Sequence, residues 1–140
     1  MMKRKTGVGI ILLNSKKEVL LILRDNIHSI PYPDCWDLPG GHPEGEEAPE
    51  ECIRREMTEE LELELGEINF FKKYIWPDFD EYIFWKFIDL EPEKVKLHEG
   101  QKVRYFSFND IKEMKLAFYY NQVFPEFYDY IKKDIYRENV

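Results

Sequence analysis

Three glutamates at helical spacing are the residues of this sequence best suited to act together chemically. Glu56, Glu59 and Glu60 stand at positions i, i+3 and i+4, which in an α-helix fall within an arc of roughly 100° on one side. No lysine follows any of them at i+4 to form a helical salt bridge. Carboxylate oxygens are the ligands that Mg²⁺ prefers. The pattern favours a Mg²⁺ site, which Mn²⁺ could also occupy, over the alternative of a solvated acidic helix face.

The negative charge of the chain is concentrated around these glutamates. The sequence has 20 Lys and Arg against 28 Asp and Glu, a net charge of -8. Between positions 44 and 62, nine glutamates face two arginines, a difference of seven. Such crowding is unfavourable unless the charges are solvated or hold a cation. Because a nucleic-acid surface needs a basic excess, we expect no nucleic-acid partner.

The residues around the glutamates predict how they are positioned. Pro49 suits the first turn of a helix, which we expect to run to about Leu61. The pair Gly40-Gly41 lets the backbone approach a ligand closely. Arg55 can pair with a carboxylate such as Glu47 and so hold the preceding loop against the helix.

Length and periodicity predict a single α/β (α+β) domain over residues 1–140, with a mixed sheet between helices. No apolar run reaches the roughly 18 residues of a membrane span. Cys35 and Cys52 form no disulfide scaffold, so we expect a cytoplasmic protein with no membrane partner. The expected strands are 6–14, 19–24, 67–76, 81–90 and 102–106, and the expected helices are 49–61, a short one capped by Ser107 or Asn109, and 122–136.

The glycine and the glutamates together resemble the Nudix box, G-x5-E-x7-R-E-U-x-E-E-x-G-U, where U is aliphatic. Gly41, Glu47 and the run 55–63 carry every charged position of this motif, so the box spans residues 41–63. The last glycine of the motif is Glu62 here. In the family this glycine ends the helix, and a left-handed non-glycine residue costs on the order of 1 kcal/mol. We still expect the helix to end near Leu61, because the leucines that follow alternate with glutamates.

The resemblance implies roles for the residues of the box. The three helix glutamates would hold the metal, and the carbonyl of Gly40 or Gly41 would add a ligand. Glu47 and Gly41 would also be structural, and Arg55 would belong to the catalytic set. The general base stays open among three glutamates: Glu56, Glu59 and Glu99.

Three candidates outside the box also come from the resemblance. Glu99 lies in His98-Glu99-Gly100-Gln101, which is similar to the loop where MutT-type members carry a further catalytic glutamate; the alternative is an ordinary charged loop. Arg24 ends a strand where relatives often place a phosphate contact, or it is a surface arginine. Asn121 stands roughly where purine-reading relatives place an asparagine, although we favour a simple helix N-cap.

The function implied is a Mg²⁺-dependent hydrolase of a nucleoside diphosphate linked to another group, X. The leading substrate is a nucleoside triphosphate, cleaved to nucleoside monophosphate and pyrophosphate. ADP-ribose or a nucleoside diphosphate sugar comes second. A non-catalytic nucleotide-sensing module is the alternative of another class, but such modules usually lose box glutamates that this chain keeps. The nucleobase, the number of metal ions and the choice between monomer and homodimer stay open.

Overall fold

The computed structural model describes residues 4–138, and the side chains through Lys133, as a mixed β-sheet between helices. The strand order is β3-β2-β1-β6-β5, with β4 paired to β1 and β7 paired to β2. The pair β1 and β6 is parallel and the other pairs are antiparallel. The strands are β1 Lys5–Leu13, β2 Val19–Leu23, β3 Trp36–Asp37, β4 Gly40–Gly41, β5 Asn69–Ile75, β6 Phe79–Phe87 and β7 Lys102–Phe106. The helices are α1 Pro49–Leu61, α2 Phe108–Lys112, α3 Tyr120–Glu138 and the 3-10 turn η1 Pro92–Lys94.

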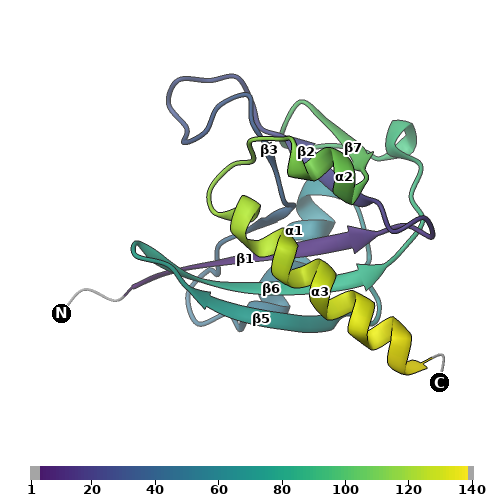
Figure 1. The fold of residues 1–140 in the computed structure, drawn as a ribbon. Coiled ribbons are helices and arrows are strands. Elements are labelled where there is room, and N and C mark those ends of the chain that lie inside the picture. Colours follow the sequence, from purple (N-terminus) through teal and green to yellow (C-terminus); the bar gives the residue numbers. More distant parts are fainter. Residues whose placement is uncertain (1–3, 139–140) are drawn as a thin grey trace.

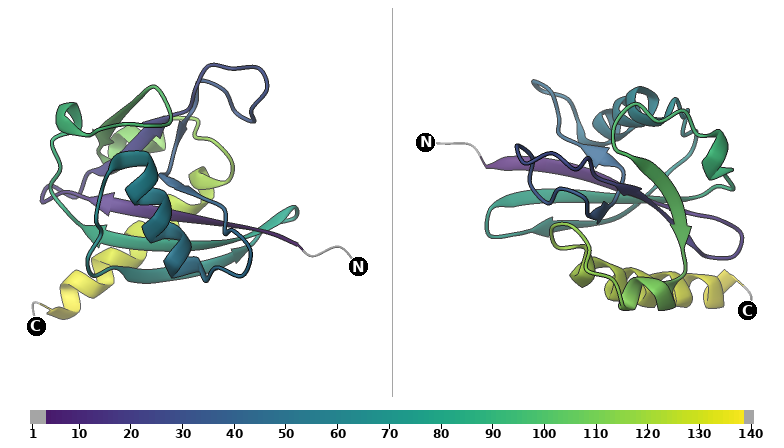
Figure 2. Two further views of the ribbon diagram at one scale, coloured as in Figure 1. Left: turned by 180° about the vertical axis from the view of Figure 1, so that it is seen from behind. Right: turned by 90° about the horizontal axis from the view of Figure 1, so that it is seen from above.

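The central strand β1 is buried on both faces because a helix covers each face. Figure 1 shows α3 crossing one face of the sheet, and the view from behind in Figure 2 shows α1 on the other. Val8, Ile10 and Leu12 of β1 belong to the core under α1. Ile11 and Leu13, which alternate with them, belong to the core under α3. The expected mixed sheet between helices is confirmed, and no helix within residues 4–138 is long and apolar enough to cross a membrane.

The helix α1 presents the predicted apolar stripe to the sheet. Ile53, Met57 and Leu61 are all nearly inaccessible to solvent. Cys52 lies in the same core, and burial raises the pKa of its thiol to about 12. The thiol is therefore a small core side chain and not an activated nucleophile. Because this stripe fixes the rotation of α1, it also fixes which glutamates face β4.

The end of α1 lies where the sequence predicts it. The last helical residue is Leu61, and Glu62 adopts the left-handed conformation with φ 51° and ψ 41°. The N–H of Glu62 donates to the carbonyl of Thr58 at 3.1 Å, and the N–H of Leu63 donates to that of Met57 at 3.1 Å. These bonds satisfy carbonyls that the end of the helix leaves free. Glu62 thus takes the conformation for which the Nudix motif uses glycine.

The starts of β6 and α3 each lie two residues earlier than the sequence predicts. The strand β6 begins at Phe79, because Phe79 and Asp80 pair in parallel with the start of β1. The turn before it is closed by Trp76, whose N–H donates to the carbonyl of Phe79 at 2.9 Å. The helix α3 begins at Tyr120, two residues earlier than expected. Ser107, one of the two predicted caps, does cap α2, because its Oγ accepts from the N–H of Asp110 at 3.1 Å.

Glycine at position 62 should leave the melting temperature unchanged or raise it by up to about 5 °C. Glycine relieves the left-handed strain of Glu62, whereas the exposed contact with His98 that it removes adds little to stability. Thermal denaturation of Glu62→Gly should be compared with that of Glu59→Gly, a substitution within the helix. The control should melt about 2–5 °C below the wild type, because glycine is a poor helix former. A drop of several degrees for Glu62→Gly would contradict this account.

Candidate active site

The structure brings four of the predicted site residues together on one side of α1. An added Cβ at Gly41 of β4 would lie 2.2 Å from the carboxyl carbon of Glu56, so glycine is what allows the two to meet. Glu60 lies close enough to the carboxyl groups of Glu56 and Glu99 for both to raise its pKa. Glu99 comes from the segment between β6 and β7, which is distant in sequence from the helix. Three carboxyl groups therefore converge next to a glycine that leaves room for them.

Glu60 is the buried member of this group and is 8% exposed. Among the side chains that the structure describes, no Lys, Arg or His forms an ion pair with it. Burial, and next the neighbouring carboxyl groups of Glu56 and Glu99, raise the pKa of Glu60 well above its usual range. A hard divalent cation would supply the positive charge that this oxygen-rich site lacks. The donor set therefore fits Mg²⁺.

Arg55 is the cation that organises the rest of the motif. Its Nε and Nη2 donate to the two carboxylate oxygens of Glu47 at 2.8 and 3.0 Å, which is the predicted pair in bidentate form. Its hydrogen bonds hold the pKa of Glu47 down at about 2. Its Nη2 also donates to the carbonyl of His42 at 3.0 Å. The guanidinium thus fastens the segment between β4 and α1 to the helix.

The same guanidinium draws the outer carboxylates toward itself. Arg55 Nη1 donates to Glu56 at 3.0 Å and to Glu59 at 3.1 Å. Within residues 4–138, no three His, Cys, Asp or Glu side chains already surround one point in a way that would hold a metal. Glu59 is exposed, however, and its long side chain can change rotamer. Assembly of all three helix glutamates around an ion therefore stays a prediction.

Arg24, a predicted phosphate contact, is held by other residues of the protein. Its Nη1 donates to Asp37 at 2.8 Å, and its Nε donates to the carbonyl of Pro31 at 2.9 Å. The guanidinium also lies 5.2 Å from the centre of the Phe118 ring. Burial raises the pKa of Asp37 to about 6, although Arg24 opposes the shift. Arg24 is thus not a free surface arginine, because its guanidinium is engaged by Asp37, Pro31 and Phe118.

Asn121 is not the N-cap that we favoured from the sequence. It is the second residue of α3, and its Oδ1 accepts from the N–H of Leu116 at 2.8 Å. Its Nδ2 donates to the carbonyl of Met114 at 2.8 Å. Both partners lie in the loop after α2. An N-cap would stand before the first helical residue, and that residue is Tyr120. The side chain therefore shapes the loop and does not cap the helix.

Sequence reasoning missed a buried acidic residue on the α3 face of the sheet. Glu81 of β6 is 3% exposed and accepts hydrogen bonds from Trp76 Nε1 at 3.1 Å and from the Tyr120 hydroxyl. Burial raises the pKa of its carboxyl group, and the two hydrogen bonds oppose the shift. The available signal was an acidic residue inside a strand rich in aromatic residues. It satisfies polar groups of the core, because both donors belong to buried aromatic side chains.

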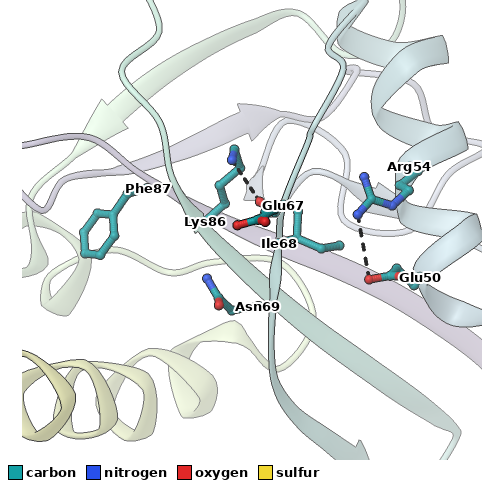
Figure 3. Close-up of a pocket in the computed structure, with 7 residues that line it drawn as sticks. All are labelled: Glu50, Arg54, Glu67, Ile68, Asn69, Lys86 and Phe87. Carbon is teal, nitrogen blue, oxygen red and sulfur yellow. Dashed lines mark hydrogen bonds and ion pairs between the residues drawn. The ribbon is translucent and has the colours of Figure 1, made fainter.

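A polar surface cavity of about 430 Å³ lies elsewhere, between α1 and the β5–β6 hairpin. Figure 3 shows Arg54 directed toward Glu50 on the α1 side of this cavity, and Lys86 directed toward Glu67 on the side of the strands. It is lined by Glu50, Arg54, Glu67, Ile68, Asn69, Lys86 and Phe87. No carboxylate of the predicted metal site takes part in this lining. The cavity is therefore distinct from the candidate active site.

The sequence model of the NUDIX domain family matches residues 3–127, so the chain belongs to the Nudix family. Among solved structures, a MutT/Nudix family protein of Listeria innocua is 20% identical, with a TM-score of 0.78 over 96% of this chain and 98% of the other. The Nudix domain of Shewanella oneidensis NrtR, solved with ADP ribose, is 17% identical, with a TM-score of 0.77 over 94% and 90%. At these identities the structural similarity shows the fold alone.

Curated relatives match a shorter region. RNA pyrophosphohydrolases of Pseudomonas aeruginosa and Pseudomonas paraeruginosa are 38% identical over 65 residues. This region is 46% of this chain and 37% of the relatives, so the chain spans well under two thirds of their length.

Of two adjacent glycine-to-alanine substitutions, one should mainly lower activity and the other should mainly lower stability. At Gly41 an added Cβ meets the flexible end of Glu56, so Gly41→Ala should fold but lose about 10-fold or more in activity. At Gly40 it would lie 2.0 Å from the backbone carbonyl of Val8, so Gly40→Ala should lower the melting temperature by several degrees. Melting curves and turnover of both variants test this. Equal effects of both substitutions on both quantities would contradict it.

Removing the partner of Asp37 should destabilise the protein more as pH rises. Because burial raises the folded pKa of Asp37 from 3.8 to about 6, the fold binds an extra proton in this range and loses stability as the pH increases through it. Arg24→Met should extend this loss to higher pH and cost about 3 kcal/mol near neutrality. Urea denaturation at about pH 5 and about pH 8 measures the difference. Arg24→Lys is the control that keeps a cation, and equal destabilisation of Arg24→Met at both pH values would contradict the argument.

Proposed function

We propose that this chain is a Mg²⁺-dependent pyrophosphohydrolase of nucleoside diphosphates linked to a group X, with nucleoside triphosphates as preferred substrates. The observation that carries the proposal is the contact of buried Glu60 with Glu56 and Glu99 in the absence of a paired cation among the described residues. An acidic protein can bind a polyphosphate when a cation lies between the carboxylates and the phosphates. The products would be a nucleoside monophosphate and pyrophosphate.

The helix glutamates Glu56, Glu59 and Glu60, with a carbonyl of Gly40 or Gly41, would hold the metal. A bound Mg²⁺ supplies charge neutralisation for the phosphates and lowers the pKa of coordinated water. Glu99, Glu59 and Glu56 are the candidates to accept the proton of the attacking water. The new bond joins the water oxygen to phosphorus, and the bridging P–O bond breaks, so that the departing phosphate keeps its electron pair.

Residues outside the helix would orient the substrate. Arg24 is linked to the segment that carries Glu99, because Gln101 Nε2 donates to the Arg24 carbonyl at 2.7 Å and to Asp34 at 2.8 Å. We propose that Arg24 contacts a phosphate. We also propose that Asn121 affects base recognition through the loop it holds, since its oxygen and nitrogen are already bonded to that loop.

The preference for a triphosphate is supported by the placement of Glu99 beside Glu60. The Pseudomonas relatives are named RNA pyrophosphohydrolases, and one structural neighbour was solved with ADP ribose. A net charge of -8 favours a mononucleotide over RNA. A screen of nucleoside triphosphates, ADP-ribose, nucleoside diphosphate sugars and 5′-triphosphorylated RNA, with analysis of products, decides among these classes. Faster cleavage of ADP-ribose or RNA than of any nucleoside triphosphate would reject the proposed preference.

A non-catalytic nucleotide sensor is the alternative from another class. The retained box glutamates and their contact with Glu99 support an enzyme, because binding alone does not need a cluster of possible proton acceptors. Turnover beyond one equivalent in the same screen separates the two.

Cys35 and Cys52 are both free thiols, which supports the proposed cytoplasmic location.

Removal of divalent metal should abolish hydrolysis. The carboxylates around Glu60 would repel a polyphosphate without a cation between them. Turnover should stop in EDTA and return with Mg²⁺ or Mn²⁺. A circular dichroism spectrum in EDTA serves as the folding control. Undiminished turnover in EDTA would reject the proposed chemistry.

Replacing the clustered carboxylates by neutral amides should show that turnover depends on them. Glu56→Gln and Glu59→Gln should each lower turnover about 100-fold or more, because an amide is a poor metal ligand and no base. Glu99→Gln should also slow turnover. The matched control is Glu46→Gln, which changes an exposed glutamate at a variable position of the box and should leave turnover unchanged. Wild-type rates for both Glu56→Gln and Glu59→Gln would exclude the box as the active site.

A further inference from the structure

The segment that carries Glu99 is attached to the end of α1 through the preceding residue. The N–H of His98 donates to the carbonyl of Glu60 at 2.8 Å. The imidazole of His98 hydrogen-bonds through Nε2 to a carboxylate oxygen of Glu62 at 2.5 Å. Lys96 approaches the same carboxylate less closely, at 4.0 Å. Glu62, which stands at the position of the motif's last glycine, therefore contacts His98 through its side chain. His98 immediately precedes Glu99, the predicted catalytic glutamate.

The other side of Glu99 is fixed to β2. The N–H of Gln101 donates to the carbonyl of Leu23 at 2.8 Å. Gly100 has φ 87°, and an added Cβ there would lie 3.0 Å from the same carbonyl, so the chain turns closely against the strand. Glu99 thus lies between an anchor on the sheet and an anchor on the helix. The sheet anchor combines this backbone bond with the Gln101 side chain, whose Nε2 donates to the carbonyl of Arg24, whereas the helix anchor includes the Glu62 side chain.

We propose that Glu62 and His98 are positioning residues that hold Glu99 against the carboxylates of α1. The left-handed backbone of Glu62 ends the helix as the glycine of the motif would, and the side chain adds an acceptor that glycine cannot offer. This inference rests on the proposed function, because it assigns Glu99 a part in hydrolysis. The departure from the motif then has a role in catalysis at the cost of a strained backbone.

The expected effect is local and modest. The side chains of Glu62 and His98 are 45% and 54% exposed, so their contact adds little to the stability of the whole fold. The bond from the His98 N–H to the Glu60 carbonyl persists in any side-chain variant. Loss of the side-chain contact should therefore reduce the fraction of molecules in which Glu99 is docked by about 2- to 5-fold.

Steady-state kinetics on the full chain with Mg²⁺ tests the proposal against a merely structural role. His98→Ala and Glu62→Gly should each lower kcat by about 2- to 5-fold, with KM unchanged. The double variant should be no slower than either single variant, because both remove one contact. His98→Gln, which keeps a donor, should restore most of the rate. Lys96→Ala is the matched control on the same segment and should change kcat little.

The decisive comparison is the same substitutions in a Glu99→Gln background. If Glu62 and His98 act through Glu99, neither His98→Ala nor Glu62→Gly should reduce the residual rate further. A second measurement is independent of activity. Hydrogen exchange of the amides of residues 98–101 in the metal-free protein should be about 2- to 5-fold faster in both variants, while exchange in α1 is unchanged.

The outcomes are distinguishable from failure of the proposed function. Unchanged turnover in Glu56→Gln, Glu59→Gln and Glu99→Gln would reject the function itself. Slow turnover in Glu99→Gln with wild-type kcat and exchange in His98→Ala would reject only the positioning role. A loss in His98→Ala that persists in the Glu99→Gln background, or that affects KM alone, would also overturn it.

Discussion

A buried carboxylate that pairs with no cation among the described side chains is the constraint on which the candidate active site depends. Glu60 is surrounded by the core of α1 and by two other carboxyl groups, an arrangement that disfavours its charged form. Such a group costs stability unless a ligand or cofactor makes use of it. The proposed metal site explains why the fold tolerates this group, and the remainder of the Nudix motif is arranged around it.

Arg55 limits that cost, because some of its hydrogen bonds hold the loop in place and others orient carboxylates beside Glu60. Two donors hold Glu47, and with it the segment between β4 and α1. Another donor reaches Glu56 and Glu59, the carboxylates that stand beside Glu60 on the helix. A single guanidinium thus links the formation of the loop to the orientation of the proposed metal ligands, as a planar fork can and a lysine cannot.

The sheet provides the rigid reference for all of these groups. The glycines of β4 pair with β1, which is buried on both faces, so Gly41 is held at a fixed distance from α1. The Glu99 segment is tied to β2 on one side and to the end of α1 on the other. The carboxyl groups and carbonyls of the site come from β4, α1 and the segment that carries Glu99. All three are positioned by elements that pack on a common core.

The sequence by itself determined the parts of this protein that depend on local spacing. The glutamate face, the apolar stripe of α1 and the end of the helix before Glu62 all follow from residues within a few positions of one another, where helical geometry is fixed. Only the tertiary structure decided which distant side chains meet. The contact of Glu60 with Glu99, the engagement of Asn121 by its loop and the burial of Glu81 depend on loops and strand pairing. Sequence periodicity carries no information on such contacts, because they form between segments whose separation is set by the packing of the whole sheet.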